Sequence, residues 1–246
     1  MRRGAWLLVL VSLTACATPE RRPAPVLPPP AREFLDELVT RWRGFEDLQG
    51  IVEFTLERRE RTQRYMGPLF LRAPAALRFE ALSPLGQPLL VVAMDGETFT
   101  LYSLVEDRAV VGPATERAMS RWLDLPLPPA TLVALLAGFV LPLPEIEGGV
   151  LIQDGHEARL DLEEHGRVRQ RIWFDPQERW VRRVEWEGSG MGFQATLNLD
   201  QSMTLTVPDR MITLHVRYHE RTLGVGLPLA RFRVELPEGT SVTRIP

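Results

Sequence analysis

The chain contains no lysine, since all 29 of its basic residues are arginine. A Walker-type phosphate-binding loop, a Schiff-base nucleophile and a serine–lysine dyad each require a side-chain amine. The absence of lysine therefore excludes these three kinds of site.

Cysteine is almost as scarce, because the only one is Cys16. It ends the sequence Leu13-Thr14-Ala15-Cys16, after Arg2-Arg3 and an apolar stretch over residues 5–11. This order is typical of a secretory signal peptide, here residues 1–15. Its end resembles the bacterial lipobox, in which the cysteine is lipidated and becomes the N-terminus. We therefore expect a lipid anchor on Cys16; the alternative is an ordinary signal peptide with an incidental cysteine.

Few other features point to a membrane-spanning or nucleic-acid-binding protein. No other stretch reaches the roughly 18 apolar residues that a membrane helix needs. After cleavage the chain would carry 27 arginines and 32 acidic residues, a formal charge of −5. This balance argues against a nucleic-acid partner. Residue 17 is alanine and not the aspartate associated with inner-membrane retention, which favours anchoring on the periplasmic face of the outer membrane.

The remaining sequence predicts one mainly β domain over residues 32–246, after a proline-rich linker over residues 16–31. Apolar residues at helical spacing predict an amphipathic helix over residues 32–43. From residue 48 to 104, and again from about 150, apolar and polar residues alternate, which predicts strands. The last of these alternations is Phe232, Val234 and Leu236. Between the two strand regions, residues 114–137 predict two short helices, the second ending at Gly138.

These elements predict one curved antiparallel sheet of about ten to eleven strands. The helices are too few to cover a flat sheet of this size, so the apolar face must be enclosed by curvature. We expect an incomplete barrel with the short helices as a plug or lid.

Several segments resemble the LolA/LolB lipoprotein-localisation superfamily, and the LolB receptors most of all. The likeness rests on Leu82-Ser83-Pro84-Leu85-Gly86, on the elbow Leu125-Pro126-Leu127-Pro128, and on an apolar helix that ends in Gly138. In the order of the predicted elements, this likeness covers nearly the whole chain after Cys16. In matching sequence motifs, it covers about a quarter of that chain. The helix before Gly138 lacks a tryptophan that the family often has.

The resemblance implies a lipid-anchored acceptor that takes acylated lipoproteins, or other lipids, from a periplasmic LolA-like carrier and inserts them into the outer membrane. It assigns an exposed leucine in a short loop to the insertion step, and Leu85 matches that position. Packing of Leu85 against a neighbouring edge is the alternative. A monomer without a cofactor is expected. The predicted lining of the acyl cavity consists of apolar residues from the strands and the second helix: Val52, Phe54, Leu56, Phe79, Leu132, Leu135, Leu136, Leu160, Ile172, Phe174, Leu197 and Leu214.

Other motifs give weaker indications. His215 and His219 have the spacing of a helical zinc pair, but on a strand they would be roughly 13 Å apart, too far for one metal. Arg167, Arg169 and Arg171 could attract anionic head groups or pair with acids on the next strand. The glycine-rich segment 188–192 precedes no helix, so it predicts a hairpin tip and not a phosphate site.

Two other functions remain open, and a third, an enzyme, is not expected. The protein could be a LolA-like lipoprotein that carries another lipid in an export system, or a structural lipoprotein whose barrel is filled by its own side chains. No serine lies in a G-x-S-x-G context, so we do not expect an esterase or another enzyme.

Overall fold

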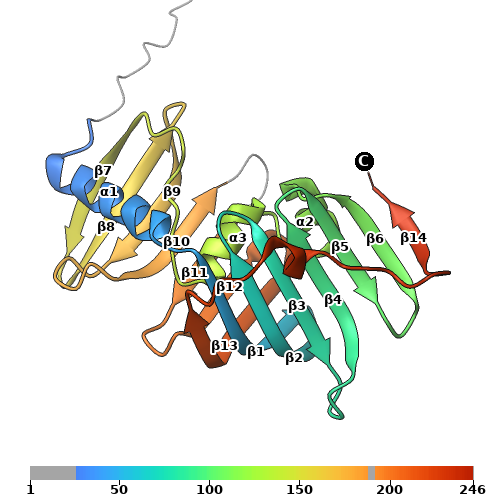
Figure 1. Cartoon of the computed structure of the whole chain (residues 1–246). Helices are drawn as coiled ribbons and strands as arrows, with labels where there is room; N and C mark the ends of the chain where they lie inside the picture. Colours follow the sequence, from blue (N-terminus) through green and yellow to red (C-terminus); the bar gives the residue numbers. More distant parts are fainter. Residues whose placement is uncertain (1–25, 188–191, 246) are drawn as a thin grey trace, which may run out of the picture.

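The computed structural model describes residues 26–187 and 192–245, and one sheet dominates this part of the chain (Figure 1). Its strands are β1 (Asp47–Arg58), β2 (Arg61–Arg72), β3 (Ala76–Leu82), β4 (Pro88–Asp95), β5 (Thr98–Ser103), β6 (Arg108–Pro113), β7 (Gly148–Asp154), β8 (Glu157–Glu164), β9 (Arg167–Phe174), β10 (Val181–Glu187), β11 (Gly192–Leu197), β12 (Met203–Val207), β13 (Ile212–Leu223) and β14 (Ser241–Arg244). The helices are α1 (Pro29–Arg43), α2 (Glu116–Trp122), α3 (Pro129–Leu136) and the 3-10 helices η1 (Pro208–Arg210) and η2 (Leu229–Phe232). The predicted signal peptide and Cys16 lie outside the described residues.

Two meanders, β1–β6 and β7–β13, form the sheet by joining at β1 and β13. These strands pair antiparallel from Leu48 opposite Leu223 to Arg58 opposite Ile212. The outermost strands are β14 and β7, and they do not pair with each other, so the sheet stays unclosed. The prediction of a mainly β, unclosed sheet with few helices is confirmed.

The predicted strand number was too low, because the described sheet has 14 strands instead of ten to eleven. The sequence analysis missed β6 and β14, which are short and lack a clear alternation of apolar and polar residues. In addition, β14 joins β6 in parallel, whereas the other pairings are antiparallel.

The central strands have one irregular pairing, between β1 and β13, and one close backbone approach, between β2 and β3. The register of β1 against β13 shifts between Ile51 and Val52, which is a β-bulge. On β2, a Cβ at Gly67 would lie only 1.9 Å from the carbonyl oxygen of Glu80. Glycine is therefore the residue that fits this position.

The helices agree with the predictions apart from one boundary. Helix α1 begins at Pro29, before the predicted start at residue 32, so the end of the predicted linker is helical. Proline suits the first turn because its missing N–H needs no partner there. Thr115 caps α2, since its Oγ1 accepts a hydrogen bond from the Ala118 N–H at 3.2 Å.

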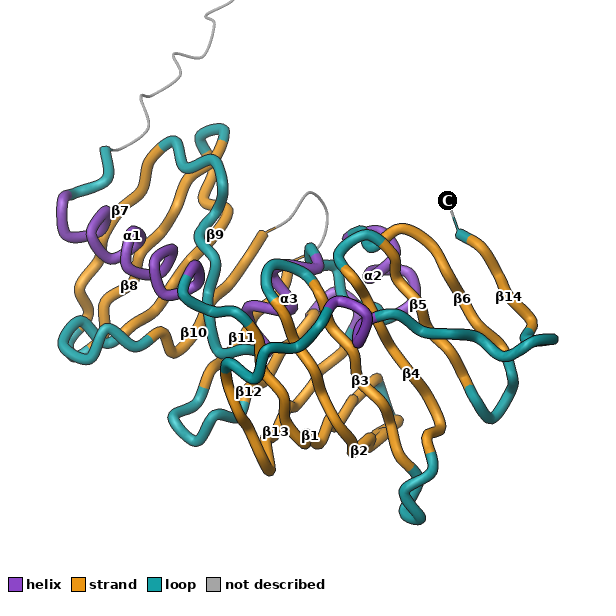
Figure 2. Tube along the Cα trace, viewed as in Figure 1, coloured by secondary structure: helices purple, strands orange, loops and turns teal. Residues whose placement is uncertain are grey.

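The predicted strand at Phe232, Val234 and Leu236 was wrong. Residues 224–240 cross the outer face of the sheet, where η2 contacts β3 and β4 (Figure 2). Phe232 packs with Phe70, Ala76 and Leu227, while Val234 and Leu236 pack against a cluster on β4, β5 and β6. Apolar and polar residues alternate here because one side of an extended segment is buried against the sheet. The segment is not hydrogen-bonded to the sheet as a strand.

A buried carboxylate fixes the start of this crossing segment. Asp47 is 3% exposed, and its two oxygens accept hydrogen bonds from the N–H groups of Val225 and Leu227, each at 2.8 Å. The Asp47 carbonyl accepts a third from Gly224 at 3.0 Å. One side chain thus ties β1 to the chain that leaves β13.

Replacing Asp47 with alanine should lower the free energy of unfolding by about 2–4 kcal/mol, because one buried and one partly buried N–H group lose their acceptors. Urea denaturation followed by circular dichroism measures the change. The matched control is Glu46→Ala, whose side chain is exposed and whose loss should cost less than about 0.5 kcal/mol. Equal effects of the two substitutions would contradict this role of Asp47.

Candidate functional site

The inner face of the sheet carries a continuous apolar core that reaches both meanders. All twelve predicted lining residues belong to it: eleven are buried, and Leu56 is partly buried against them. The structure therefore places these residues in one core. Their side chains pack against protein, so their role in lining a lipid cavity remains a prediction.

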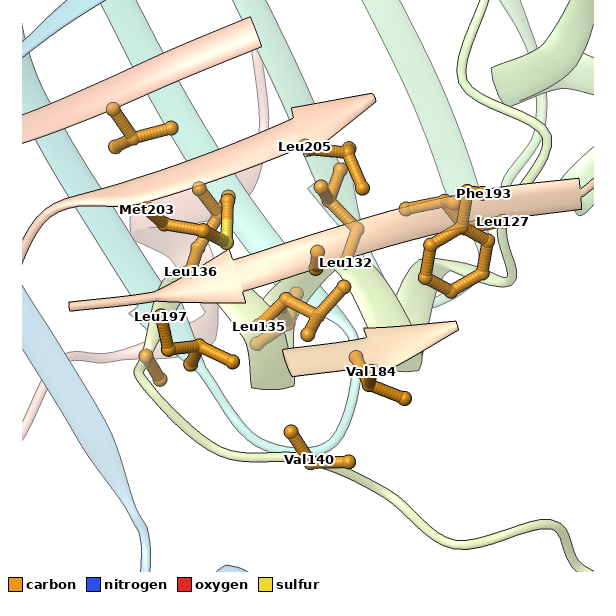
Figure 3. Close-up of a cluster of buried hydrophobic side chains, with 14 of the residues drawn as sticks. Leu127, Leu132, Leu135, Leu136, Val140, Val184, Phe193, Leu197, Met203 and Leu205 are labelled. Carbon is orange, nitrogen blue, oxygen red and sulfur yellow. The ribbon is translucent and has the colours of Figure 1, made fainter. Parts of the chain in front are cut away.

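Helix α3 supplies the centre of this core (Figure 3). Six of its eight residues are buried. Leu132, Leu135 and Leu136 lie among side chains of β10, β11 and β12, including Val184, Leu197 and Leu205. A helix that is apolar on nearly all sides is stable only when it is enclosed, and this explains its unusual composition.

The carboxyl end of α3 is fixed by its own backbone and by β13. Gly138 adopts φ +84°, and Phe139 donates its N–H to the Ala134 carbonyl at 2.8 Å, which is a Schellman ending. The Tyr218 hydroxyl donates to the Leu136 carbonyl at 2.7 Å, and the Arg221 guanidinium donates to the Ala137 carbonyl at 2.5 Å. Burial raises the pKa of Tyr218 and lowers the pKa of Arg221.

Helix α1 covers the β7–β10 part of the inner face. Phe34 stacks on Phe174 of β9 with ring centroids 3.8 Å apart. Arg179 forms ion pairs with Glu37 and, at 3.9 Å, with Glu33. Only four of the fifteen residues of α1 are buried. This helix is thus held by one narrow apolar stripe and by partly exposed charges.

A pocket of about 640 Å³ lies between α1 and the segment that leads into β7. Leu35 and Val39 of α1 line one side, and Leu143 and Ile146 line the other. Arg32, Asp36 and Glu147 supply polar groups. Its size is within the range of small-molecule sites, and its lining combines apolar and charged side chains.

Gln170 holds the second wall of this pocket in place. Its side chain is 1% exposed and reaches from β9 to the segment after α3. The amide nitrogen donates to the Leu141 carbonyl at 2.8 Å, and the amide oxygen accepts from the Leu143 N–H at 2.9 Å. Both main-chain groups of an irregular segment are thereby satisfied within the core.

Leu85 lies in the turn between β3 and β4 with 87% of its surface exposed. The turn is closed by its own hydrogen bonds, because Ser83 Oγ accepts from the N–H groups of Leu85 at 3.3 Å and Gln87 at 3.1 Å. Gly86 adopts φ +77°. The alternative in which Leu85 packs against a neighbouring edge is therefore not observed.

The other predicted motifs have ordinary surroundings. Arg171 pairs with Glu187 at 2.8 Å and Arg169 with Glu164 at 3.5 Å, so these two arginines of the stripe meet acids. His215 and His219 lie on β13, as the strand prediction required. Among residues 26–187 and 192–245, no cluster of three or more His, Cys, Asp or Glu residues could hold a metal, and no helix is long and apolar enough to cross a membrane. Residues 188–191 of the glycine-rich segment lie outside the described part.

Comparison with solved structures gives the fold. The chain is similar to an outer-membrane lipoprotein-sorting protein domain from Vibrio parahaemolyticus, with a TM-score of 0.53, 13% identity and coverage of 81% of this chain and 94% of that one. A LolA superfamily protein from Nitrosomonas europaea gives a TM-score of 0.54, 11% identity and coverage of 83% and 97%. A DUF1329 family protein from Desulfovibrio piger gives the same four values. This chain has a LolA-like fold.

The superfamily resemblance predicted from sequence is therefore confirmed at the level of the fold. No protein-family profile and no curated sequence matches the chain. The closer likeness to the LolB receptors remains a prediction.

Sequence reasoning missed the pocket beside α1 and the residues that support it. Gln170 is a polar residue at an inward position of a strand, since it alternates with Ile172 and Phe174. That signal was present, because a buried amide needs partners and marks a crossing backbone. No comparable signal identified Tyr218 and Arg221, whose partners are far away in sequence.

Replacing Gln170 with leucine should lower the free energy of unfolding by about 2–4 kcal/mol, since a buried carbonyl and a buried N–H lose their partners. Thermal unfolding measures the change. Gln63→Leu, at an exposed position of β2, is the control and should change stability by less than about 0.5 kcal/mol. A Gln170→Leu protein as stable as the parent would show that the two hydrogen bonds contribute nothing.

Proposed function

We propose that this protein is a lipid-anchored acceptor that binds acyl chains on the inner face of its sheet and passes lipoproteins into the outer membrane. The observation that carries the proposal is the continuous apolar core on the inner face of a LolA-like sheet, beside which a pocket of about 640 Å³ lies open along α1. The sequence likeness to LolB receptors and the lipobox motif at Cys16 support the anchored, outer-membrane form of this function.

The energetics of acyl binding are favourable enough for such a role. Each buried methylene contributes roughly 0.8 kcal/mol, so a chain of about 15 methylenes contributes up to about 12 kcal/mol. Shifting α1 would expose Phe34, Leu35 and Leu38, at about 1.5–3 kcal/mol each. A long acyl chain could therefore replace the contacts of α1, whereas a chain of a few carbons could not.

The exposed turn at Leu85 suits the release step. Neighbouring apolar side chains are exposed with it, namely Val105 in the β5–β6 turn and Leu89 at the start of β4. A main-chain hydrogen bond links Leu89 to the start of the β5–β6 turn, because the Leu89 carbonyl accepts the Leu104 N–H at 3.0 Å. A short apolar tip of this kind can enter the surface of a bilayer without unfolding the domain.

Another reading has one observation in its favour. The predicted lining residues are packed against protein, as they would be in a structural lipoprotein without a ligand. A carrier of a different lipid would share the acyl-binding core, but it would not need Leu85 for insertion of lipoproteins.

Acyl binding is tested first with residues 17–246, which contain every described residue. In native mass spectrometry we expect a bound phospholipid or acylated peptide whose mass is lost on denaturation. Val39→Trp should fill the pocket and weaken binding of a fluorescent palmitoyl probe at least tenfold. Val105→Trp, on the exposed tip, should leave this affinity unchanged. An apo mass that persists with added lipid would contradict the proposal and favour the structural reading.

The insertion role is tested by Leu85→Glu. We expect acyl binding and the melting temperature to remain at the parent values, because the side chain is exposed and contributes little to packing. Transfer of an acylated lipoprotein to outer-membrane vesicles should fall at least tenfold. Leu199→Glu, which changes an 80% exposed leucine in the β11–β12 turn, is the control. Undiminished transfer by Leu85→Glu would favour the carrier of another lipid.

A further inference from the structure

The described sheet ends in two outermost strands, the four-residue β14 and the seven-residue β7. At one end β14 pairs with β6, and the Ile245 N–H donates to the Val111 carbonyl at 2.9 Å. At the other end β7 is the last strand of the described sheet. An uncovered edge presents N–H and C=O groups that can pair with another strand.

Apart from its last residue, Asp154, β7 lacks the charges and prolines that usually block such pairing. Residues 148–153 read Gly-Gly-Val-Leu-Ile-Gln and contain neither a charge nor a proline. Val150 and Ile152 face the outer side of the sheet, opposite Asp161 and Arg159, and are 41% and 36% exposed. Leu151 lies opposite Leu160 on the inner side, partly buried against the core. Both faces of this edge are therefore apolar.

The same stretch is complementary to itself when it is reversed about Leu151. In an antiparallel pair, residues directly opposite one another lie on the same face. Two copies centred on Leu151 would place Leu151 opposite Leu151, Val150 opposite Ile152, and Gly149 opposite Gln153. Each pair is matched in face, and no charged residue opposes another across these positions. Shifting the register by one residue would set inner against outer side chains.

We propose that two copies of this chain associate through antiparallel pairing of their β7 strands, centred on Leu151. The pairing would continue the sheet from one copy to the other and cover Val150 and Ile152. A second copy is favoured over an unrelated peptide because the sequence of β7 supplies its own complement in the same register. This inference does not depend on the proposed function, and it replaces the monomer expected from sequence. An edge of this length buries less than a standard interface, so association should be reversible and weak.

The register is tested by introducing one cysteine into residues 17–246, a form that contains no other cysteine. Opposed residues have Cα atoms about 4.5–5.5 Å apart, within the range of a disulfide. Leu151→Cys should therefore form a covalent dimer under mild oxidation. Val150→Cys should not, since the two copies of residue 150 would be separated by roughly 8 Å. The double variant Val150→Cys, Ile152→Cys should form the dimer again. Cross-linking of Val150→Cys as efficient as that of Leu151→Cys would overturn the proposed register.

The association itself is measured without cysteine variants. Sedimentation equilibrium of residues 17–246 should show a concentration-dependent dimer in the micromolar range. Ile152→Lys places a charge in the pairing and should weaken association at least tenfold. Leu199→Lys changes an exposed apolar residue away from β7 and should leave association unchanged. A protein that remains monomeric up to millimolar concentration, or a dimer unaffected by Ile152→Lys, would overturn the proposal.

Discussion

The whole structure depends on covering one apolar face of a sheet that does not close. Fourteen strands bring a continuous set of apolar side chains to the inner side, and an unclosed sheet cannot bury them by curvature alone. Three short α-helices and the segment after α3 complete the cover. This explains why α3 is apolar on nearly all sides, whereas α1 needs only a narrow apolar stripe.

Covering a core with irregular chain creates a second requirement, because every buried main-chain group needs a partner. Asp47 supplies acceptors where the chain leaves β13, and Gln170 supplies both a donor and an acceptor beneath the segment after α3. Tyr218 and Arg221 bind the carbonyls at the end of α3. These buried or half-buried polar side chains thus stand where regular structure ends.

The sequence predicted most strands and helices because their apolar spacing reflects burial on one face. The same rule failed at Phe232, Val234 and Leu236, where burial on the outer face produced alternation without a ladder. It also failed at β14, whose residues are all exposed and carry no burial pattern. The core side of the candidate site was predictable, since its residues alternate on strands. The pocket beside α1 was not, because it depends on where a long connection crosses the sheet.

Under the proposed function, the helices α1 and α3, which both cover the core, must differ in how easily they move. Six of the eight residues of α3 are buried, and its carboxyl end is bound by Tyr218 and Arg221. Helix α1 buries four of fifteen residues and is otherwise held by partly exposed ion pairs, which contribute at most about 1 kcal/mol each. Replacing protein contacts with acyl-chain contacts therefore costs the least free energy along α1, where a pocket already exists. Acyl chains would therefore enter beside α1, while α3 would keep its position in the core.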